Sequence, residues 1–472
     1  MKRYSVTLRD IERAVVRKTG TNRNLFSSVR RNFELEPRDF TPERTTVWSF
    51  KSRGGWATHS GDYRGNWSPF IPRNLLLRYS NPGDLVLDPF CGGGTTPVEA
   101  KLLGRRCIAR DIVPAAVETT LRNLSFSVPP QMALGHDSLR IYEPVVQVGD
   151  ARELTGIADS SVDLVCTHPP YSDIVHYSDG IEGDISFHPL DSFLVDMECV
   201  AKECFRVLKP GKHCAILIGD MRKNKRVVPL GFMTIQRFLE QGFVLRDLII
   251  KRQHNCRTTG YWYSSSVRYN FLLLAQEYLP IFLKPDDKTT PMMSTETAEC
   301  TCRRLSLDEL EHPAALECKT TWVFDSANYE RLLLGNIVAR YGGLHTLAID
   351  AAHSCYDTSC HGADAADPEQ FDMVYIRLPV RHQVDAYVVE LLRRIENCVR
   401  QFGHVVIRAS DYRVGDLTVC PALEVWQLLG PTFRIRELIV VVCSDPDLSS
   451  TRPEELAIAH EYLLVFQKDM PK

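Results

Sequence analysis

The chain has 472 residues, of which 44% are hydrophobic and 24% are charged, and its formal net charge is −3. This length exceeds what one ordinary core supports and predicts two or three domains of a soluble globular protein. No apolar run approaches the ~18 residues of a membrane span, so we expect no membrane partner. The N-terminus has no apolar signal segment and the 15 cysteines follow no framework spacing, so we expect reduced thiols in the cytoplasm, in a prokaryotic cytosol or nucleoid.

Positive charge is concentrated at the start of the chain. Residues 1–53 contain 13 Lys and Arg against 6 Asp and Glu, a difference of +7 on an otherwise mildly acidic chain. We therefore expect a basic N-terminal arm over residues 1–54. Such an arm suits a polyanionic partner, although a solvated basic face has the same composition.

Short apolar runs and amphipathic segments alternate after the arm. Strands are predicted over 84–90, 107–112, 145–150, 162–167 and 213–220, and helices over 97–104, 115–124, 191–207 and 232–242. This βαβα order indicates an α/β fold with a parallel, doubly wound sheet and helices on both faces. Two further apolar runs, 244–251 and 269–277, are separated by a polar loop and predict an antiparallel hairpin at the sheet edge.

A change in composition marks the end of this first region. Residues 284–303 are rich in charges, Thr, Ser and Pro and have little periodicity, which predicts an interdomain linker that we extend to residue 318. The chain is thus expected to divide into the arm (1–54), a first domain (55–283), the linker (284–318) and a second domain (319–472).

Segments of the second domain resemble segments of the first. The matching pairs are VDLVCTHPPY (162–171) with FDMVYIRLPV (371–380), GKHCAILIGD (211–220) with GHVVIRASD (403–411), AQEYLPIF (275–282) with AHEYLLVF (459–466), and VGDA (148–151) with AIDA (348–351). The third pair is the most similar. The second domain is therefore predicted to be a divergent copy of the first, although short strands of unrelated α/β sheets also look alike.

The segment DPFCGGGTT (88–96) places Phe90, Gly92 and Gly94 between a strand and a helix. Glycines there allow a tight turn and let a ligand approach the backbone at a helix N-terminus. The next two strands end in Asp111 and Asp150, so three consecutive strand ends would present polar groups to one ligand. From these residues alone, NAD and a phosphate both remain possible ligands.

The fourth strand ends in His168-Pro169-Pro170-Tyr171. The prolines have no backbone N–H donor and leave their carbonyl acceptors available, and the tyrosine supplies a flat stacking surface. Acceptors beside an aromatic ring suit a planar base with an exocyclic amino group. A proline turn that ends a strand is the simpler interpretation of this element on its own.

DPFCGGGTT followed by THPPY resembles the S-adenosylmethionine-dependent DNA methyltransferases that modify exocyclic amino groups, N6 of adenine or N4 of cytosine. The segment NWSPFIPRNLLLRYSNPGDLVLDPF (66–90) is similar to the family element that closes over the methionine end of the cofactor. The resemblance covers roughly residues 55–282, in the unpermuted order. It implies a Rossmann-like methyltransferase sheet with an edge β-hairpin, followed by a second, degenerate α/β methyltransferase-like domain.

This resemblance implies a role for each matching residue. The glycine loop would hold S-adenosylmethionine, Asp111 its ribose, Asp150 its adenine ring and the Trp67–Pro72 segment its methionine moiety. The implied cofactor-binding residues are Trp67, Ser68, Pro72, Asp88, Phe90, Gly92, Gly94, Thr95, Asp111, Ile112, Asp150 and Ala151. The implied catalytic residues are His168, Pro169, Pro170 and Tyr171.

His168 departs from the family pattern, which has Asp, Asn or Ser before Pro-Pro-Tyr. That side chain accepts a hydrogen bond from the target amino group, which a neutral imidazole does in one tautomer and a protonated imidazole does not. From an unperturbed pKa of about 6.5 we expect methylation to slow below neutral pH. In the alternative, His168 only packs at the strand end and the Pro169 carbonyl is the acceptor.

This chemistry needs no nucleophilic side chain, because the amino nitrogen attacks the cofactor directly. Cytosine-C5 methylation would need a cysteine just after the proline, whereas Cys166 precedes the prolines within the strand and is expected in the core. A base in a duplex would have to be flipped and stacked on Tyr171.

Two basic segments near the strand ends are candidates for phosphate contacts. The candidate nucleic-acid-binding residues are Arg222, Lys223, Lys225, Arg226, Lys251 and Arg252. Ordinary solvated loops would have the same composition. The acidic loop 172–193 is instead a candidate lid or target-reading loop.

The second domain has Arg377 where the first has His168, and Leu-Pro-Val where the first has Pro-Pro-Tyr, with no F-x-G-x-G before it. We expect it to be catalytically inert and to read DNA, mediate dimerisation or support the first domain. The segment HSCYDTSCH (353–361) matches no common zinc-ligand spacing, so no metal is expected.

The sequence therefore predicts a site-specific methyltransferase that acts on double-stranded DNA, stand-alone or paired with a cognate restriction nuclease, with a homodimer as one option. An RNA methyltransferase, for example of tRNA guanosine N2, is one alternative because its relatives have a similar glycine loop and a D-P-P-Y. A non-catalytic nucleic-acid-binding protein with a vestigial methyltransferase fold is another. The joint presence of the glycines, Asp111, Asp150 and Tyr171 argues against the last, and adenine and cytosine both remain possible targets.

Overall fold

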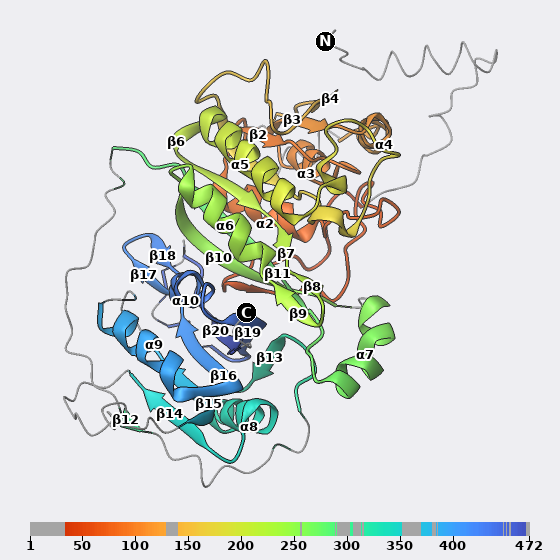
Figure 1. The fold of residues 1–472 in the computed structure, drawn as a ribbon. Helices are drawn as coiled ribbons and strands as arrows, with labels where there is room; N and C mark the ends of the chain where they lie inside the picture. The colour runs from red at the N-terminus through yellow and green to blue at the C-terminus, as the bar shows by residue number, and fades with distance from the viewer. Residues whose placement is uncertain are drawn as a thin grey trace.

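The computed structural model describes residues 34–468, apart from 129–139, 255–256, 288, 290–302, 305–312, 314–315, 352–369, 380–383, 385, 447, 450 and 453–454. Figure 1 shows two α/β units, one formed by the N-terminal half of the chain and one by the C-terminal half. Each unit has its own large sheet. In the part of the chain that the structure describes, no helix is long and apolar enough to cross a bilayer.

The first sheet has the strand order β1-β10-β11-β6-β5-β2-β3-β4, with β7 paired to β11. Its central strands are parallel and β11 is antiparallel to both neighbours, which confirms the doubly wound α/β class. Its strands are β1 (Val47–Trp48), β2 (Leu85–Asp88), β3 (Arg106–Asp111), β4 (Val145–Val148), β5 (Val162–Thr167), β6 (Leu208–Ile216), β7 (Ile218–Gly219), β10 (Val244–Arg252) and β11 (Gln276–Leu283). Its helices are α2 (Phe70–Tyr79), α3 (Thr95–Leu102), α4 (Pro114–Asn123), α5 (Leu190–Val207) and α6 (Leu230–Glu240).

The central strand β5 shows why this sheet could be predicted from the sequence. All six of its residues are buried. Leu164 and Cys166 face a cluster that includes Ile71 of α2, whereas Val165 faces a cluster that includes Phe193 of α5. A strand covered on both faces has a continuous apolar sequence, and Cys166 is a core residue as expected.

The predicted strand over 269–277 is wrong. These residues end α7 (Arg257–Tyr269) and continue as irregular chain, and β11 runs over 276–283 instead. The apolar run is explained by packing rather than by a strand, because Leu272 is buried in one cluster with Trp322 of the second unit. The antiparallel β10–β11 pair is also not the edge of the sheet, since β1 pairs with β10 on the outside.

The second sheet repeats most of the first. Its order is β12-β14-β15-β16-β20-β19-β13, and the last six strands correspond to β2-β5-β6-β11-β10-β1 with the same parallel and antiparallel pairings. The strands are β12 (Arg303–Arg304), β13 (Thr321–Phe324), β14 (Thr346–Asp350), β15 (Phe371–Arg377), β16 (Val399–Ser410), β19 (Arg434–Cys443) and β20 (His460–Gln467). The helices are α8 (Tyr329–Tyr341), α9 (Ala386–Cys398) and α10 (Pro421–Leu429).

The likeness stops at β2. Beyond β14 the described residues add only the two-residue β12, which is antiparallel, where the first sheet continues with parallel β3 and β4. The predicted match of 148–151 with 348–351 is therefore wrong. Because β14 pairs with β15 as β2 pairs with β5, Asp350 occupies the place of Asp88 rather than of Asp150.

The two units contact each other through matching backbone bonds. Before β1, the Thr46 N–H donates to the Ala457 carbonyl of the second unit at 2.8 Å. Before β13, the Thr320 N–H donates to the Leu273 carbonyl of the first unit at 2.9 Å. In each unit, the segment just before β1 or β13 therefore forms a backbone hydrogen bond with the segment just before the last strand of the other unit. Residues 34–54, which the sequence assigns to the basic arm, include β1 and this contact.

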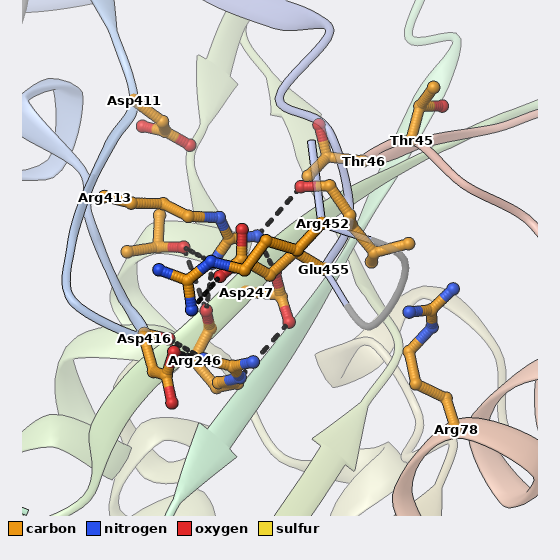
Figure 2. Close-up of polar contacts among 12 residues, drawn as sticks. Thr45, Thr46, Arg78, Arg246, Asp247, Asp411, Arg413, Asp416, Arg452 and Glu455 are labelled. Atoms are coloured by element: carbon orange, nitrogen blue, oxygen red, sulfur yellow. Dashed lines mark hydrogen bonds and ion pairs between the residues drawn. The ribbon is translucent and has the colours of Figure 1, made fainter. Parts of the chain in front are cut away.

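Two arginines form a second matching pair of contacts. Arg222 of β8 (Met221–Lys223) donates to Glu437 of β19 at 2.5 Å, and Arg413 of β17 (Tyr412–Val414) donates to Asp247 of β10 (Figure 2). Both carboxylates are almost fully buried, with 1% and 4% of the side chain exposed. An arginine of each unit thus binds a carboxylate of the other. Such reciprocal contacts are typical of a two-fold symmetric dimer interface, and here they join two units of one chain.

Candidate active site

The predicted strand ends border one cleft at the carboxyl edge of the first sheet. The cleft contains about 720 Å³ of space, part of it open to solvent. Ten of the predicted cofactor and catalytic residues line it, namely Trp67, Asp88, Phe90, Gly92, Asp111, Ile112, Asp150, Ala151, His168 and Pro170. We call it the first cleft.

Four of the predicted cofactor residues do not line the first cleft. Ser68 lines a second cleft, described below, and its hydroxyl donates to the Arg53 carbonyl at 2.7 Å. Pro72 is buried within α2, and Gly94 and Thr95 form the start of α3 behind the loop. In this arrangement they support the walls of the site.

The glycine loop requires its glycines for two separate reasons. Gly92 and Gly94 have φ values of +50° and +86°, in the left-handed region that other residues avoid. Gly93 is pressed against Asn66, and a Cβ there would lie 2.5 Å from the side-chain nitrogen. The Asn66 side chain also accepts a hydrogen bond from the Gly93 N–H at 3.2 Å, which fixes the loop against the segment that precedes α2.

The Asp111 carboxylate ends β3 in the first cleft. Its oxygens accept hydrogen bonds from the N–H groups of Gly92 at 2.9 Å and Val113 at 3.0 Å. Burial raises its pKa to about 6, and these two bonds oppose the shift. Asp88 has the same pKa for the same reason, with Thr167 donating to it at 2.6 Å. Both carboxylates therefore have remaining acceptor capacity that a ligand with hydroxyl groups can use.

Asp150, at the end of β4, is paired to an arginine. Arg152 donates to the Asp150 carboxylate at 2.7 Å and to Asp196 of α5 at 2.7 Å. Gly183 lies against this pair, since a Cβ there would come within 2.7 Å of Arg152. Loop 172–193 is thereby attached to the strand that carries Asp150.

A second cleft of about 1150 Å³ adjoins the first. The residues that line both clefts are Gly65, Asn66, Trp67, His168 and Tyr177. Pro169 and Tyr171 line only the second cleft, whereas Pro170 lines only the first. The HPPY segment therefore forms the wall at which the two clefts meet.

A chain of polar contacts holds His168 at this junction. Its Nε2 lies 2.9 Å from the Tyr171 hydroxyl, which donates to Glu277 of β11 at 2.8 Å, and Lys251 of β10 donates to the same carboxylate at 2.5 Å. Burial raises the pKa of Glu277, but Lys251 and the other donors outweigh it and the net pKa is below the ordinary value. Glu277 is thus ionised.

The ionised Glu277 decides the tautomer of His168. Tyr171 has one hydroxyl proton, and a carboxylate is a stronger acceptor than an imidazole. Nε2 of His168 then carries the proton and donates to the Tyr171 oxygen, which leaves Nδ1 unprotonated. The Gly65 backbone also lies within hydrogen-bonding range of the ring and raises the pKa of His168, against the larger lowering by burial. Trp67 stacks on the imidazole ring with 5.7 Å between centroids and keeps it in this orientation.

The expected pKa of about 6.5 for His168 is wrong. Burial lowers the pKa of His168 to about 4, because the buried imidazolium is poorly solvated. The imidazole is therefore neutral throughout the range from pH 6 to 8. Protonation would remove the acceptor only in much more acidic solution.

The six predicted phosphate-contacting residues lie in different environments in the structure. The assignment of Arg222 is wrong, because its guanidinium is committed to Glu437 in the interface between the units. Lys251 lines the second cleft, paired to Glu277. Lys225, in the turn between β8 and β9 (Arg226–Val228), lies 3.8 Å above the Tyr269 ring of α7. Lys223 and Arg226 flank it in the same hairpin, and Arg252 follows Lys251 at the end of β10.

Sequence reasoning missed several residues of the site. Tyr63, Asn66 and Tyr177 line the first cleft, and Glu277 fixes the tautomer of His168. Asn66 begins the predicted cofactor segment 66–90 and Tyr177 lies in the predicted lid loop 172–193, but nothing in the sequence singles out either residue, and Tyr63 lies in no predicted element. Glu277 had a weak signal, because it is one of the identities in the match between AQEYLPIF and AHEYLLVF.

No cluster of three or more His, Cys, Asp and Glu that could hold a metal ion occurs among the described residues. The segment 353–361, which contains two His and two Cys, lies outside them.

Comparison with known families decides the membership of the chain. The sequence model of the N6/N4 methyltransferase family, described as DNA methylase, matches residues 15–122 and 162–344, which is more than half of the chain. The chain belongs to this DNA methylase family. A model of an RMKL-like methyltransferase domain also matches residues 75–182, which contain the glycine loop and HPPY.

Individual relatives match shorter stretches. The tRNA (guanine(10)-N2)-dimethyltransferase of Methanothermobacter thermautotrophicus is 36% identical over 110 residues, which are 23% of this chain and 29% of that protein. The type II beta methyltransferase M.BslI of a Bacillus species is 34% identical over 113 residues, 22% of this chain and 12% of that protein. The type II methyltransferase M.EcaI of Enterobacter cloacae is 45% identical over 51 residues, 11% of each chain. The matched segments thus span less than a third of each of these relatives.

S-adenosylmethionine is the cofactor of this family, and the residues of the first cleft fit it. Gly92 lines the first cleft, and a Cβ there would lie 2.9 Å from the Tyr63 ring, which lines the same cleft. Asp111 offers acceptor capacity for hydroxyl groups, and Phe90 and Trp67 offer apolar surface. The chain's own donors and acceptors therefore suit a nucleoside with an aliphatic tail.

Proposed function

We propose that the chain is a DNA methyltransferase that transfers the methyl group of S-adenosylmethionine to an exocyclic amino nitrogen, N6 of adenine or N4 of cytosine. The observation that supports this most is the meeting of two clefts at His168-Pro169-Pro170-Tyr171. One cleft suits the cofactor, and the other is large enough for a base. The reacting nitrogen and the methyl group would meet at the wall that the clefts share.

In this proposal the residues of the first cleft hold the cofactor. Asp111 binds the ribose hydroxyls, Asp150 and Ala151 lie at the adenine ring, and Trp67 lies at the methionine end. When bound, S-adenosylmethionine supplies an electrophilic methyl group on a sulfonium. The remaining work of the protein is to position the acceptor nitrogen and to stabilise the charge that develops on it.

His168 is the proposed acceptor for the target amino group. Its Nδ1 lone pair takes a hydrogen bond from the amino N–H, which draws the nitrogen lone pair out of conjugation with the ring and toward the methyl group. The carbonyl of Pro169 or Pro170 accepts from the second N–H. Neither step needs a nucleophilic side chain.

The proposed base would be turned out of the duplex into the second cleft, beside Tyr171. Arg53 lines that cleft and would supply positive charge for the flanking backbone, whereas the charge of Lys251 is paired to Glu277. The relatives M.BslI and M.EcaI are type II methyltransferases. We therefore also propose that this chain is paired with a restriction nuclease.

A second candidate is methyl transfer to N2 of guanosine in RNA. It is favoured by the likeness to the archaeal tRNA (guanine(10)-N2)-dimethyltransferase, which has the highest share of its own length matched among the relatives given above. The position of the exocyclic amino group relative to His168 would be the same in both cases.

Nucleoside analysis of treated nucleic acids tests the proposal. The purified chain is incubated with S-adenosylmethionine labelled in the methyl group and with DNA and tRNA from cells that lack the gene. The account predicts labelled N6-methyladenine or N4-methylcytosine, with none from a Pro170→Ala variant. Label only in N2-methylguanosine of tRNA would replace the proposal by the second candidate, and no label in either polymer would contradict both.

A further inference from the structure

Helix α7 exposes a group of large aromatic side chains. Tyr261 is 79% exposed, Trp262 50% and Tyr263 52%, and the rings of Tyr261 and Trp262 contact each other edge to face. In Figure 1 the helix projects from the body beside β8 and β9. Of the α7 side chains that the structure describes, only Ser266 is buried. Exposed aromatic clusters of this kind mark a binding surface rather than a folding element.

The helix is next to the second cleft. Lys251 and His254 line that cleft, and α7 begins three residues after His254. Three residues span at most about 11 Å, so the first turn of α7 lies at the mouth of the cleft. Whatever enters the second cleft from a long substrate therefore has its neighbouring parts close to α7.

The charge of this region suits a polyanion. The sequence from residue 251 to 275 contains no Asp or Glu and four Lys and Arg. The β8–β9 hairpin adds Lys223 and Lys225, and the Lys225 ammonium lies 3.8 Å from the centre of the Tyr269 ring. This contact joins the hairpin to the last turn of α7 and makes one surface of alternating cations and aromatic rings.

We propose that α7 and the β8–β9 hairpin bind the DNA strand that carries the target base. Tyr261, Trp262 and Tyr263 stack on unpaired bases next to the extruded nucleotide, and Lys223 and Lys225 hold the backbone phosphates. Surfaces that combine aromatic rings with cations bind single-stranded nucleic acid in this way, because every base has a face on which a ring can stack. This inference rests on the proposed function for the nature of the substrate.

The occupant follows from charge and place together. A membrane surface or an apolar protein partner would fit the aromatic rings, but neither would explain why the helix that carries them begins three residues after a residue that lines a base-sized cleft. An acidic protein would fit the charge, but it would not use three consecutive aromatic residues beside that cleft. A nucleic-acid strand accounts for the exposed aromatic rings, the positive charge and the adjacent cleft together.

Binding is measured by fluorescence anisotropy with a labelled 20-nucleotide DNA, single-stranded and as a duplex. In the triple variant Tyr261→Ala, Trp262→Ala, Tyr263→Ala we expect the affinity for both probes to fall at least about tenfold, since stacking of one base on an aromatic side chain accounts for ten- to a hundredfold or more. The corresponding Phe variant should keep most of the affinity. Phe402→Ala, which removes an exposed aromatic side chain of the second unit, is the matched control and should change nothing.

Affinity for S-adenosylmethionine should stay unchanged in every variant, which shows that the first unit remains folded. Wild-type DNA affinity in the triple variant overturns the inference, as does an equal loss in Phe402→Ala, failure of the wild-type chain to bind either probe, or displacement of both probes by tRNA at far lower concentration. The proposed function is judged separately by the methylated nucleoside. If the chain binds DNA through α7 but does not methylate it, this inference stands and the proposed function is contradicted. If the chain methylates DNA and the triple variant has an unchanged KM for DNA, the proposed function stands and this inference is contradicted.

Discussion

The two halves of the chain share a strand order but differ where a cofactor would bind. In the first sheet, β2 is followed by parallel β3 and β4, whose ends place Asp111 and Asp150 in the first cleft. In the second sheet, the only described strand beyond β14 is the antiparallel β12, and the described residues contain no counterpart of β3 or β4. The framework of the fold survives without the strands that form half of a nucleotide site.

What the second unit retains is the surface that faces the first. The threonines before β1 and β13 make the same backbone bond to the opposite unit, and Arg222 and Arg413 reach the buried carboxylates of the opposite sheet. The two units therefore share the residues of their mutual contact, whereas they differ at the cleft. We infer that the second unit is inert in methyl transfer and supports the first, and four variants or conditions test this contrast.

The largest effect on the rate of methyl transfer is expected from a change at His168, which follows β5, compared with the matched change at Arg377, which ends β15. His168→Ala should reduce the rate of methyl transfer by about a hundred- to a thousandfold, because a preorganised hydrogen-bonding group at the reacting atom is lost. Affinity for S-adenosylmethionine should change little. Arg377→Ala, the matched change in the second unit, should leave the rate unchanged, and a comparable loss there would show that the second unit also takes part in catalysis.

The reciprocal arginines test the interface. Arg222→Met and Arg413→Met should each lower the free energy of unfolding by about 3 kcal/mol, because each removes the arginine that pairs with a buried carboxylate across the interface. Denaturant unfolding monitored by tryptophan fluorescence measures this. If the two changes differ by more than about 1.5 kcal/mol, the contacts are not equivalent and the two-fold description fails.

Asp111 and Asp350 test the cofactor site. Asp111→Ala should weaken binding of S-adenosylmethionine about a hundredfold, since two hydrogen bonds to a charged group are lost. Asp350→Ala changes the carboxylate at the end of β14 and should have no effect on calorimetric titration with the cofactor. Equal effects would mean that the second unit contributes to the cofactor site.

The smallest effect is on pH dependence. Burial holds the pKa of Asp111 and Asp88 at about 6, so the ionised form that accepts from ribose hydroxyls is present above pH 6 and is lost as the pH falls through it. Affinity for S-adenosylmethionine should therefore fall by about tenfold per pH unit below 6. The rate at saturating cofactor should stay constant from pH 6 to 8, because the pKa of His168 is about 4. A rate that halves near pH 6.5 would contradict that pKa.

Much of the first unit could be predicted because its signals are local. The glycine loop, the strand-ending aspartates and the HPPY segment are each contiguous, and β5 is apolar along its whole length because it is buried on both faces. The residues that sequence reasoning missed share the opposite property. Asn66 and Tyr177 lie in segments that the sequence marked but without a signal for the individual residue, and Glu277 reaches the second cleft from β11, far from the motifs.

The errors have the same origin. Arg222 has the composition of a phosphate-binding residue, but its partner Glu437 is distant in sequence. Residues 271–275 have the composition of a strand, but Leu272 packs in one cluster with Trp322 of the second unit. The pKa of His168 depends on a burial that no neighbouring residue in the sequence reveals.

One titration tests the central contrast most directly. Isothermal calorimetry of the full chain with S-adenosylmethionine counts the functional sites. The account predicts one site per chain, which disappears in Asp111→Ala and is unchanged in Asp350→Ala. Two sites per chain, or a single site that survives Asp111→Ala and is lost in Asp350→Ala, would contradict the assignment of the active site to the first unit.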